Sequence, residues 1–141
     1  MSTPQNFPLD TRILIVDDDA TACQILLKKL GELGYEEVTS ATDGTIAWQM
    51  IDENLRDDNP FGLVISDLEM EEIGGLELLK RIREDPRSRH IPFIMLTAYG
   101  EVNNLVNSVK AKVDDFIVKP LQGDTLKAKL ERTYSIWIKR N

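Results

Sequence analysis

Four apolar stretches of the chain lead into residues that can do phosphate and metal chemistry. The first leads into Asp17 and Asp18, the second into Asp67, the third into Thr97 and the fourth into Lys119. Carboxylates bind hard cations or attack phosphorus, whereas a hydroxyl and an ammonium group bind phosphoryl oxygens. Each ending alone is common, because acids often cap helices and polar residues often end strands. Together they predict one phosphate and metal site, if the fold brings them to one place.

The elements that must position these residues alternate between strand and helix. Apolar, β-branched stretches predict five strands, over residues 12–16, 37–41, 62–66, 91–96 and 115–118. Helical spacing predicts five helices, over residues 20–33, 43–53, 76–83, 100–112 and 123–139. Asp19 and Asp43 stand where helix N-caps are expected, and Gly34 stands where the first helix is expected to end.

This alternation predicts the fold. Strands that alternate with helices form right-handed βαβ units, in which a parallel sheet is covered on both faces. We therefore predict a single doubly wound α/β domain, a (βα)5 flavodoxin-like fold with a parallel five-stranded sheet in the order 2-1-3-4-5. The second strand contains Thr39 and Ser40 and suits the edge of the sheet. The first and third strands are then neighbours at the switch point where such sheets bind ligands.

The predicted sheet brings three carboxylates close together. Asp17, Asp18 and Asp67 would follow neighbouring strands, which lie about 4.8 Å apart. One such pair at about 5 Å is unfavourable by about 3 kcal/mol at an effective dielectric constant near 20. A cation is therefore required, and Mg²⁺ suits oxygen ligands and keeps positions open for phosphate. Lys119 follows the fifth strand, roughly 10 Å from Asp67, a distance that its long side chain can nearly span. The peptide N–H of Ala98, just beyond Thr97, suits a phosphoryl oxygen.

Composition bounds the class of protein. The 141 residues suit one domain with a sizeable core, and no apolar run approaches the about 20 residues of a membrane span. Seventeen basic and 24 acidic residues give a net charge of −7, which argues against direct binding of nucleic acid or of anionic membranes. The first ten residues lack a signal-peptide pattern, so we expect a cytoplasmic protein. The single cysteine, Cys23, is expected to pack as a small hydrophobe.

Other features have structural interpretations. The first helix carries an apolar stripe of Ala22, Ile25, Leu26, Leu30 and Leu33, and the last one of Leu126, Leu130, Tyr134, Trp137 and Ile138. Ile136 falls off the latter stripe and is expected to be exposed. His90, the only histidine, is expected in a loop. A basic cluster near the end of the third helix predicts solvated surface that complements the helix dipole; its members are Lys80, Arg81, Arg83, Arg87 and Arg89.

With these features together, nearly the whole chain closely resembles the response-regulator receiver family. The matching stretches are ILIVDDD at 13–19, LVISDLEM at 63–70, GLELLKRIR at 75–83, PFIMLTA at 92–98 and FIVKP at 116–120. The resemblance divides the chain into an N-terminal extension, residues 1–10, and a receiver domain, residues 11–141. It also implies that the protein modifies itself and does not turn over a substrate.

The resemblance implies a role for each residue of the acceptor site. Asp67 would be the phosphoacceptor and takes its phosphoryl group from a phosphohistidine of a histidine kinase or phosphotransfer protein. Asp18 would bind Mg²⁺ directly, Asp17 would bind it through water, and the backbone carbonyl of Glu69 would be a further ligand. Lys119 would be the ionic partner of the phosphoryl group.

The resemblance also implies a switch. Thr97 would follow the phosphoryl group, Phe116 would swing inward behind it, and the face formed by the fourth helix, fifth strand and fifth helix would then bind a downstream protein or a second copy of the chain. Phe116 lacks the hydroxyl of a tyrosine at this position, so packing alone would drive its movement.

Some positions depart from the family pattern. Glu71 stands where proline is usual and Gly74-Gly75 where Asp-Gly is common, so we expect a more mobile loop after Asp67. Glu69 and Tyr99 occupy positions that vary in the family and influence how long the phosphoryl group survives.

Two other functions remain open. Residues 17–21 read as the D-x-D-x-T motif of a haloacid-dehalogenase-type phosphatase, and residues 93–97 resemble its second motif. Against that, Lys119 comes after the acidic pair Asp114-Asp115, whereas the phosphatases need the pair after the lysine, and Asp67 would have no role. The second alternative is a pseudo-receiver that acts only as a protein-binding scaffold. The chain suits either a stand-alone receiver or a fragment of a longer protein.

Overall fold

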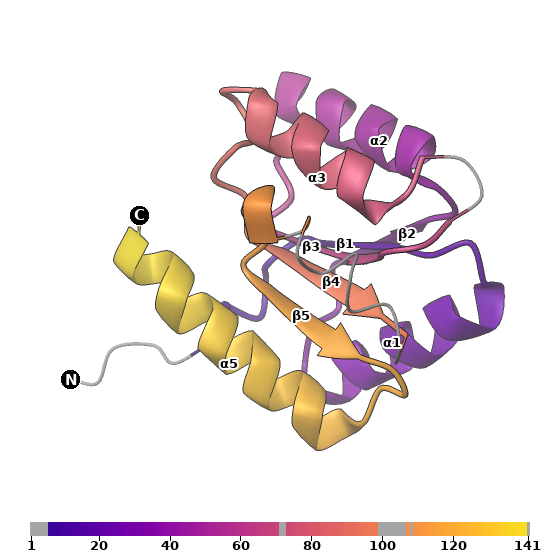
Figure 1. Cartoon of the computed structure of the whole chain (residues 1–141). Coiled ribbons are helices and arrows are strands. Elements are labelled where there is room, and N and C mark those ends of the chain that lie inside the picture. Colours follow the sequence, from indigo (N-terminus) through magenta and orange to yellow (C-terminus); the bar gives the residue numbers. More distant parts are fainter. Residues whose placement is uncertain (1–5, 71–72, 99–106, 108, 141) are drawn as a thin grey trace.

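A parallel sheet with helices on both faces forms the centre of the computed structural model, which describes residues 6–70, 73–98, 107 and 109–140 (Figure 1). The strands are β1 (Ile13–Val16), β2 (Val38–Ala41), β3 (Leu63–Asp67), β4 (Phe93–Thr97) and β5 (Asp115–Val118). All pair in parallel in the order β2-β1-β3-β4-β5. This confirms the predicted flavodoxin-like sheet, and β2 is the edge strand with its centre exposed, as expected.

The helices are α1 (Ala20–Glu32), α2 (Gly44–Arg56), α3 (Gly75–Glu84) and α5 (Gly123–Arg140). In Figure 1, α1 and α5 cover one face of the sheet, and α2 and α3 cover the other. The helix predicted over residues 100–112 lies largely outside the described residues. Within the part of the chain that the structure describes, no helix is long and apolar enough to cross a membrane.

Local signals set the helix ends. The Asp19 carboxylate accepts hydrogen bonds from the backbone N–H groups of Thr21 and Ala22, and Asp43 caps α2 in the same way through Ile46 N–H. Gly34 has φ +101°, and the hydrogen bonds from Gly34 N to Gly31 O and from Tyr35 N to Leu30 O form a Schellman motif at the end of α1. The caps predicted from the sequence are therefore confirmed.

Each face of the sheet has its own apolar core. The core below α1 and α5 contains Ile13, Ile15 and Leu130, and the core below α2 and α3 contains Leu14 and Val16. Phe7 joins the first core. Its ring packs edge-on against Tyr134 at 5.0 Å between centroids, and its carbonyl accepts the Tyr35 hydroxyl at 2.9 Å. The division of the chain at residues 10 and 11 stays a prediction, but the packing of the fold begins by Phe7.

The two predicted apolar stripes are partly wrong. Ile25 is 47% exposed because α1 buries a narrower face centred on Leu26 and Leu30. Ile138 is 39% exposed and lies in the last turn of α5. Ile136 is 43% exposed, as predicted. Cys23 packs partly buried against the core.

The prediction that the basic cluster near α3 is entirely solvated surface is wrong for Arg83. Its side chain is only 10% exposed and forms an ion pair of 2.8 Å with the fully buried carboxylate of Asp114. The contact spans 31 residues of sequence, so nothing in the local charge pattern indicates it. His90 lies in the connector between α3 and β4, as expected, and its carbonyl accepts the indole N–H of Trp137 at 2.7 Å.

Candidate functional site

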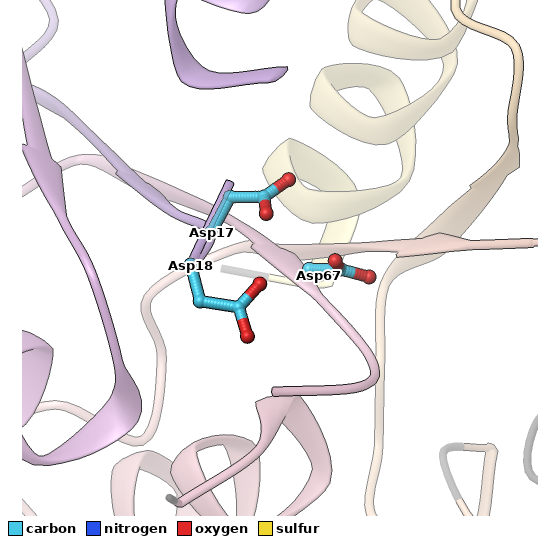
Figure 2. A group of neighbouring side chains, drawn as sticks. All are labelled: Asp17, Asp18 and Asp67. Atoms are coloured by element: carbon cyan, nitrogen blue, oxygen red, sulfur yellow. The ribbon is translucent and has the colours of Figure 1, made fainter. Parts of the chain in front are cut away.

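The parallel register brings the acidic strand ends together. Val16 of β1 pairs with Ser66 of β3, so Asp17 and Asp67, which come next, lie side by side at the carboxyl edge of the sheet. Asp18 completes the group, and ligand oxygens of the three carboxylates all lie within 4.8 Å of one another. Figure 2 shows the three side chains gathered at the ends of the two strands. The predicted acidic cluster therefore exists in the fold.

Backbone contacts hold the acidic residues in place. Asp17 donates its N–H to Ala41 O at 3.1 Å, and its carboxylate accepts Asp19 N–H at 2.9 Å. Beyond Asp67, the N–H of Leu68 donates to Leu96 O at 2.8 Å. Asp17 is buried, Asp67 is 9% exposed and Asp18 is exposed, so the cluster opens to solvent on the Asp18 side.

Lys119 reaches the cluster from β5. Its backbone N–H donates to Thr97 O at 2.8 Å, which fixes the start of the side chain. Its Nζ lies 3.1 Å from Asp67 Oδ2 and 3.6 Å from Asp17 Oδ2. Three carboxylates and one ammonium group leave two negative charges at the site, which match the charge of one divalent cation.

Burial and charge act in opposite directions on the ionisable groups. Burial raises the pKa of Asp67 above its usual range, although the hydrogen bond and charge of Lys119 oppose that rise. Burial alone would lower the pKa of Lys119, but its hydrogen bond to Asp67 and the charges of Asp67 and Asp17 outweigh this and raise it. Lys119 therefore stays protonated, and the Asp67 carboxylate is destabilised in a way that a cation would relieve.

Comparison with known proteins identifies the family. The family model described as the response regulator receiver domain matches residues 13–131, which is most of the chain. The chain belongs to this family. The receiver is 39% identical over 120 residues to the chemotaxis protein CheY1 of Helicobacter pylori, with 85% of this chain and 94% of that protein covered. It is 35% identical over 123 residues to the chemotaxis protein CheY-3 of Vibrio cholerae, with 87% and 91% covered.

Solved structures agree with this assignment. A putative response regulator from Chloroflexus aurantiacus superposes on the receiver with a TM-score of 0.80 at 32% identity, and the match covers 89% of this chain and 98% of that one. The CheY-like receiver domain protein from Methanospirillum hungatei gives a TM-score of 0.79 at 28% identity, with 94% and 99% covered.

The structure places the other predicted site residues on β4, on β5 and just after β3 and β4. Thr97 is buried at the end of β4, Ala98 follows it, and Glu69 is exposed two residues after Asp67. Phe116 is half-buried on β5, with the Lys129 ammonium 5.3 Å from its ring centroid. Tyr99 and Glu71 lie outside the described residues.

Gly75 contributes to the site through a close backbone contact that the local sequence does not indicate. A Cβ atom there would lie 2.3 Å from the carbonyl oxygen of Asp67 and 2.8 Å from Met95 Sδ. Its N–H donates to Leu68 O at 3.1 Å, so the start of α3 lies directly against the end of β3. The more mobile loop expected after Asp67 stays a prediction, and the structure adds that Gly75 permits a close backbone approach.

An apolar cavity adjoins the acidic cluster. It measures about 230 Å³ and lies between α1 and the segment that follows β5. Asp17 and Lys119 form its polar side, and Ile25, Leu26 and Leu121 contribute to its apolar side. The exposure of Ile25 is thus part of an apolar surface beside the site, which the helical stripe alone did not indicate.

Proposed function

We propose that Asp67 accepts a phosphoryl group from the phosphohistidine of a histidine kinase or phosphotransfer protein. The carboxylate attacks phosphorus, the phosphorus–nitrogen bond breaks and an aspartyl phosphate forms. The observation that supports this most is the position of Asp67, which lies within 4.8 Å of two other carboxylates and 3.1 Å from the Lys119 ammonium. Such a protein modifies itself and does not turn over a substrate.

The donor set fits Mg²⁺. Asp17, Asp18 and Asp67 supply hard oxygen ligands, and we assign the Glu69 backbone carbonyl as a further one. Bound Mg²⁺ would neutralise the two excess negative charges and the developing charge on the phosphoryl oxygens. Lys119 then orients one phosphoryl oxygen, and the Thr97 hydroxyl and Ala98 N–H bind the others.

The phosphodonor docks, in this proposal, on the apolar surface beside the cluster. Ile25 is 47% exposed, and the adjoining cavity has Asp17 and Lys119 at its polar end. A partner helix that covers this surface would bring its phosphohistidine to the open side of the site. Exposed apolar surface next to a reactive group is typical of a protein-binding site.

In this proposal, the downstream protein binds the face formed by β5 and α5. Thr97 pairs with Val118 in the sheet, and Phe116 lies two residues before it, on the same side of the strand as Val118. Movement of Thr97 toward the phosphoryl group would leave space for Phe116 to move inward. Val118 and Ile136 are 41% and 43% exposed, so this face offers apolar contacts to a downstream protein or a second copy of the chain.

Acetyl phosphate with Mg²⁺ tests the acceptor chemistry without a partner. Intact-mass spectrometry should detect one added phosphoryl group on the wild type and none on Asp67→Asn. Turnover of phosphate esters would instead favour the phosphatase alternative, and the absence of any Mg²⁺ effect would favour the scaffold. Amide chemical shifts with beryllofluoride and Mg²⁺ test the switch, since changes confined to the loops around Asp17, Asp67 and Lys119 would exclude it.

A further inference from the structure

A second cavity lies at the opposite edge of the sheet, where α3 ends and β4 and β5 begin. It measures about 260 Å³. Its lining includes five basic residues, Lys80, Arg83, Arg89, Lys110 and Lys112, and one acidic residue, Glu84. The basic residues come from α3, from the connector to β4 and from the stretch before β5, so the fold gathers them from three parts of the chain.

Arg83 makes one wall of this cavity rigid. Its Nε donates to Lys112 O at 3.0 Å, and its Nη1 donates to the carbonyls of Arg89 at 3.1 Å and Ile91 at 2.6 Å. Its Nη2 forms the 2.8 Å contact with Asp114. Because one guanidinium group joins the three segments, the other basic side chains start from fixed backbone positions.

The positive charge around the cavity exceeds what the protein itself neutralises. Asp114 lies behind Arg83, and Arg140 forms a second ion pair with it at 2.6 Å, so two guanidinium groups share one carboxylate. Burial lowers the pKa of Arg83, and Arg140 adds to this effect while Asp114 opposes it. Glu84 lines the cavity, and Glu77 pairs with Lys80 at 3.6 Å. The carboxyl end of α3 contributes about half a further negative charge. Part of the positive charge therefore remains unmatched, in a chain of net charge −7.

We propose that this cavity binds a compact anion with two linked phosphate groups, such as a diphosphate. The cavity is smaller than the about 300–1,000 Å³ of sites that enclose drug-sized ligands, so a small, highly charged group fits better than a large one. Lysine and arginine side chains on several sides suit the several oxygens of a diphosphate. The site lies away from Asp67 and does not depend on its phosphorylation.

Titration with inorganic pyrophosphate tests this site in the wild-type chain. Amide chemical shifts are followed at about 150 mM NaCl, without Mg²⁺, so that diffuse attraction is screened. Saturable shifts should appear in residues 80–84, 89 and 110–112. Lys110→Glu and Lys80→Glu, on separate segments, should each weaken binding about tenfold or more. Lys127→Glu, an exposed lysine of α5 outside the cavity lining, is the matched control and should change the affinity less than about twofold.

Three results would overturn the assignment. The first is a lack of saturable shifts up to about 10 mM pyrophosphate. The second is an equal loss of affinity in Lys127→Glu, which would mean diffuse attraction to the whole surface. The third is saturable binding of a glutamate-rich peptide where pyrophosphate does not bind, which would assign the cavity to an acidic protein segment.

Discussion

Removal of one carboxylate should separate the metal response of this receiver from its folding. In Asp18→Ala, the most exposed of the three acidic ligands is lost while Asp17, Asp67 and Lys119 keep their contacts. The wild type should gain stability from Mg²⁺, since the ion binds the folded cluster and not the unfolded chain. The variant should fold, lose this gain, and be more stable than the wild type when Mg²⁺ is absent.

The distances set the magnitudes. Two carboxylates 4.8 Å apart repel by about 3 kcal/mol at an effective dielectric constant of 20 and by about 1 kcal/mol at that of water. Because Asp18 is exposed, the lower part of that range applies to the metal-free variant. Mg²⁺ at ten times its dissociation constant adds about 1.4 kcal/mol to the wild type, which raises the midpoint of thermal unfolding by about 4–6 °C for a domain of this size.

Thermal melts followed by circular dichroism, with Mg²⁺ or EDTA, measure both effects. Asp10→Ala is the matched control, because Asp10 is an exposed acid before β1, at the other edge of the sheet. It should respond to Mg²⁺ like the wild type. An unchanged wild-type midpoint in saturating Mg²⁺, or an equal Mg²⁺ response in Asp18→Ala, would refute the reasoning.

Three further outcomes follow from the contacts. Because burial raises the pKa of Asp67, the metal-free protein should lose stability as the pH rises from the ordinary pKa of 3.8 through the raised pKa. Urea titrations at several pH values should show this loss in the wild type and not in Asp67→Asn. If Asp67→Asn shows the same loss, another group causes it. Gly75→Ala should lower the free energy of unfolding by about 1–3 kcal/mol and slow phosphorylation. The control Gly31→Ala, where nothing lies within 4 Å of the added Cβ atom, should be neutral or stabilising. Equal denaturation midpoints for the two variants would show that the contact with Asp67 is unimportant. Arg83→Met should lower the free energy of unfolding, measured by denaturation, by about 3 kcal/mol. The control Arg81→Met, at an exposed site, should lower it by less than about 0.5 kcal/mol. Similar losses in both variants would contradict a structural role of the Arg83–Asp114 pair.

The sequence was enough to predict the sheet, its order and the acidic cluster. The strands read as short, apolar, β-branched stretches, and the caps at Asp19, Gly34 and Asp43 act within a few residues of themselves. The right-handed connections predict a parallel sheet, and the polar second strand favours the order that has this strand at the edge. That order brings Asp17, Asp18 and Asp67 together without any detailed packing. Lys119 follows the same logic, because a strand end and a long side chain determine its reach.

What the sequence did not indicate depends on contacts between distant segments. The partner of Arg83 is 31 residues away, and Phe7 packs against Tyr134 at the other end of the chain. The role of Gly75 depends on how closely α3 approaches Asp67, and the exposure of Ile25 depends on how α1 is rotated on the sheet. Periodicity predicts which residues can share a face, but three-dimensional packing decides which of them are covered.

The most direct test of the proposed function is to identify the modified residue. After treatment with acetyl phosphate and Mg²⁺, borohydride reduces an aspartyl phosphate to homoserine, and peptide mass spectrometry locates it. We predict homoserine at position 67 alone, and none when Mg²⁺ is replaced by EDTA. Homoserine at position 17 or 19, or an unmodified Asp67 under conditions that label the protein, would contradict the assignment of Asp67 as the phosphoacceptor.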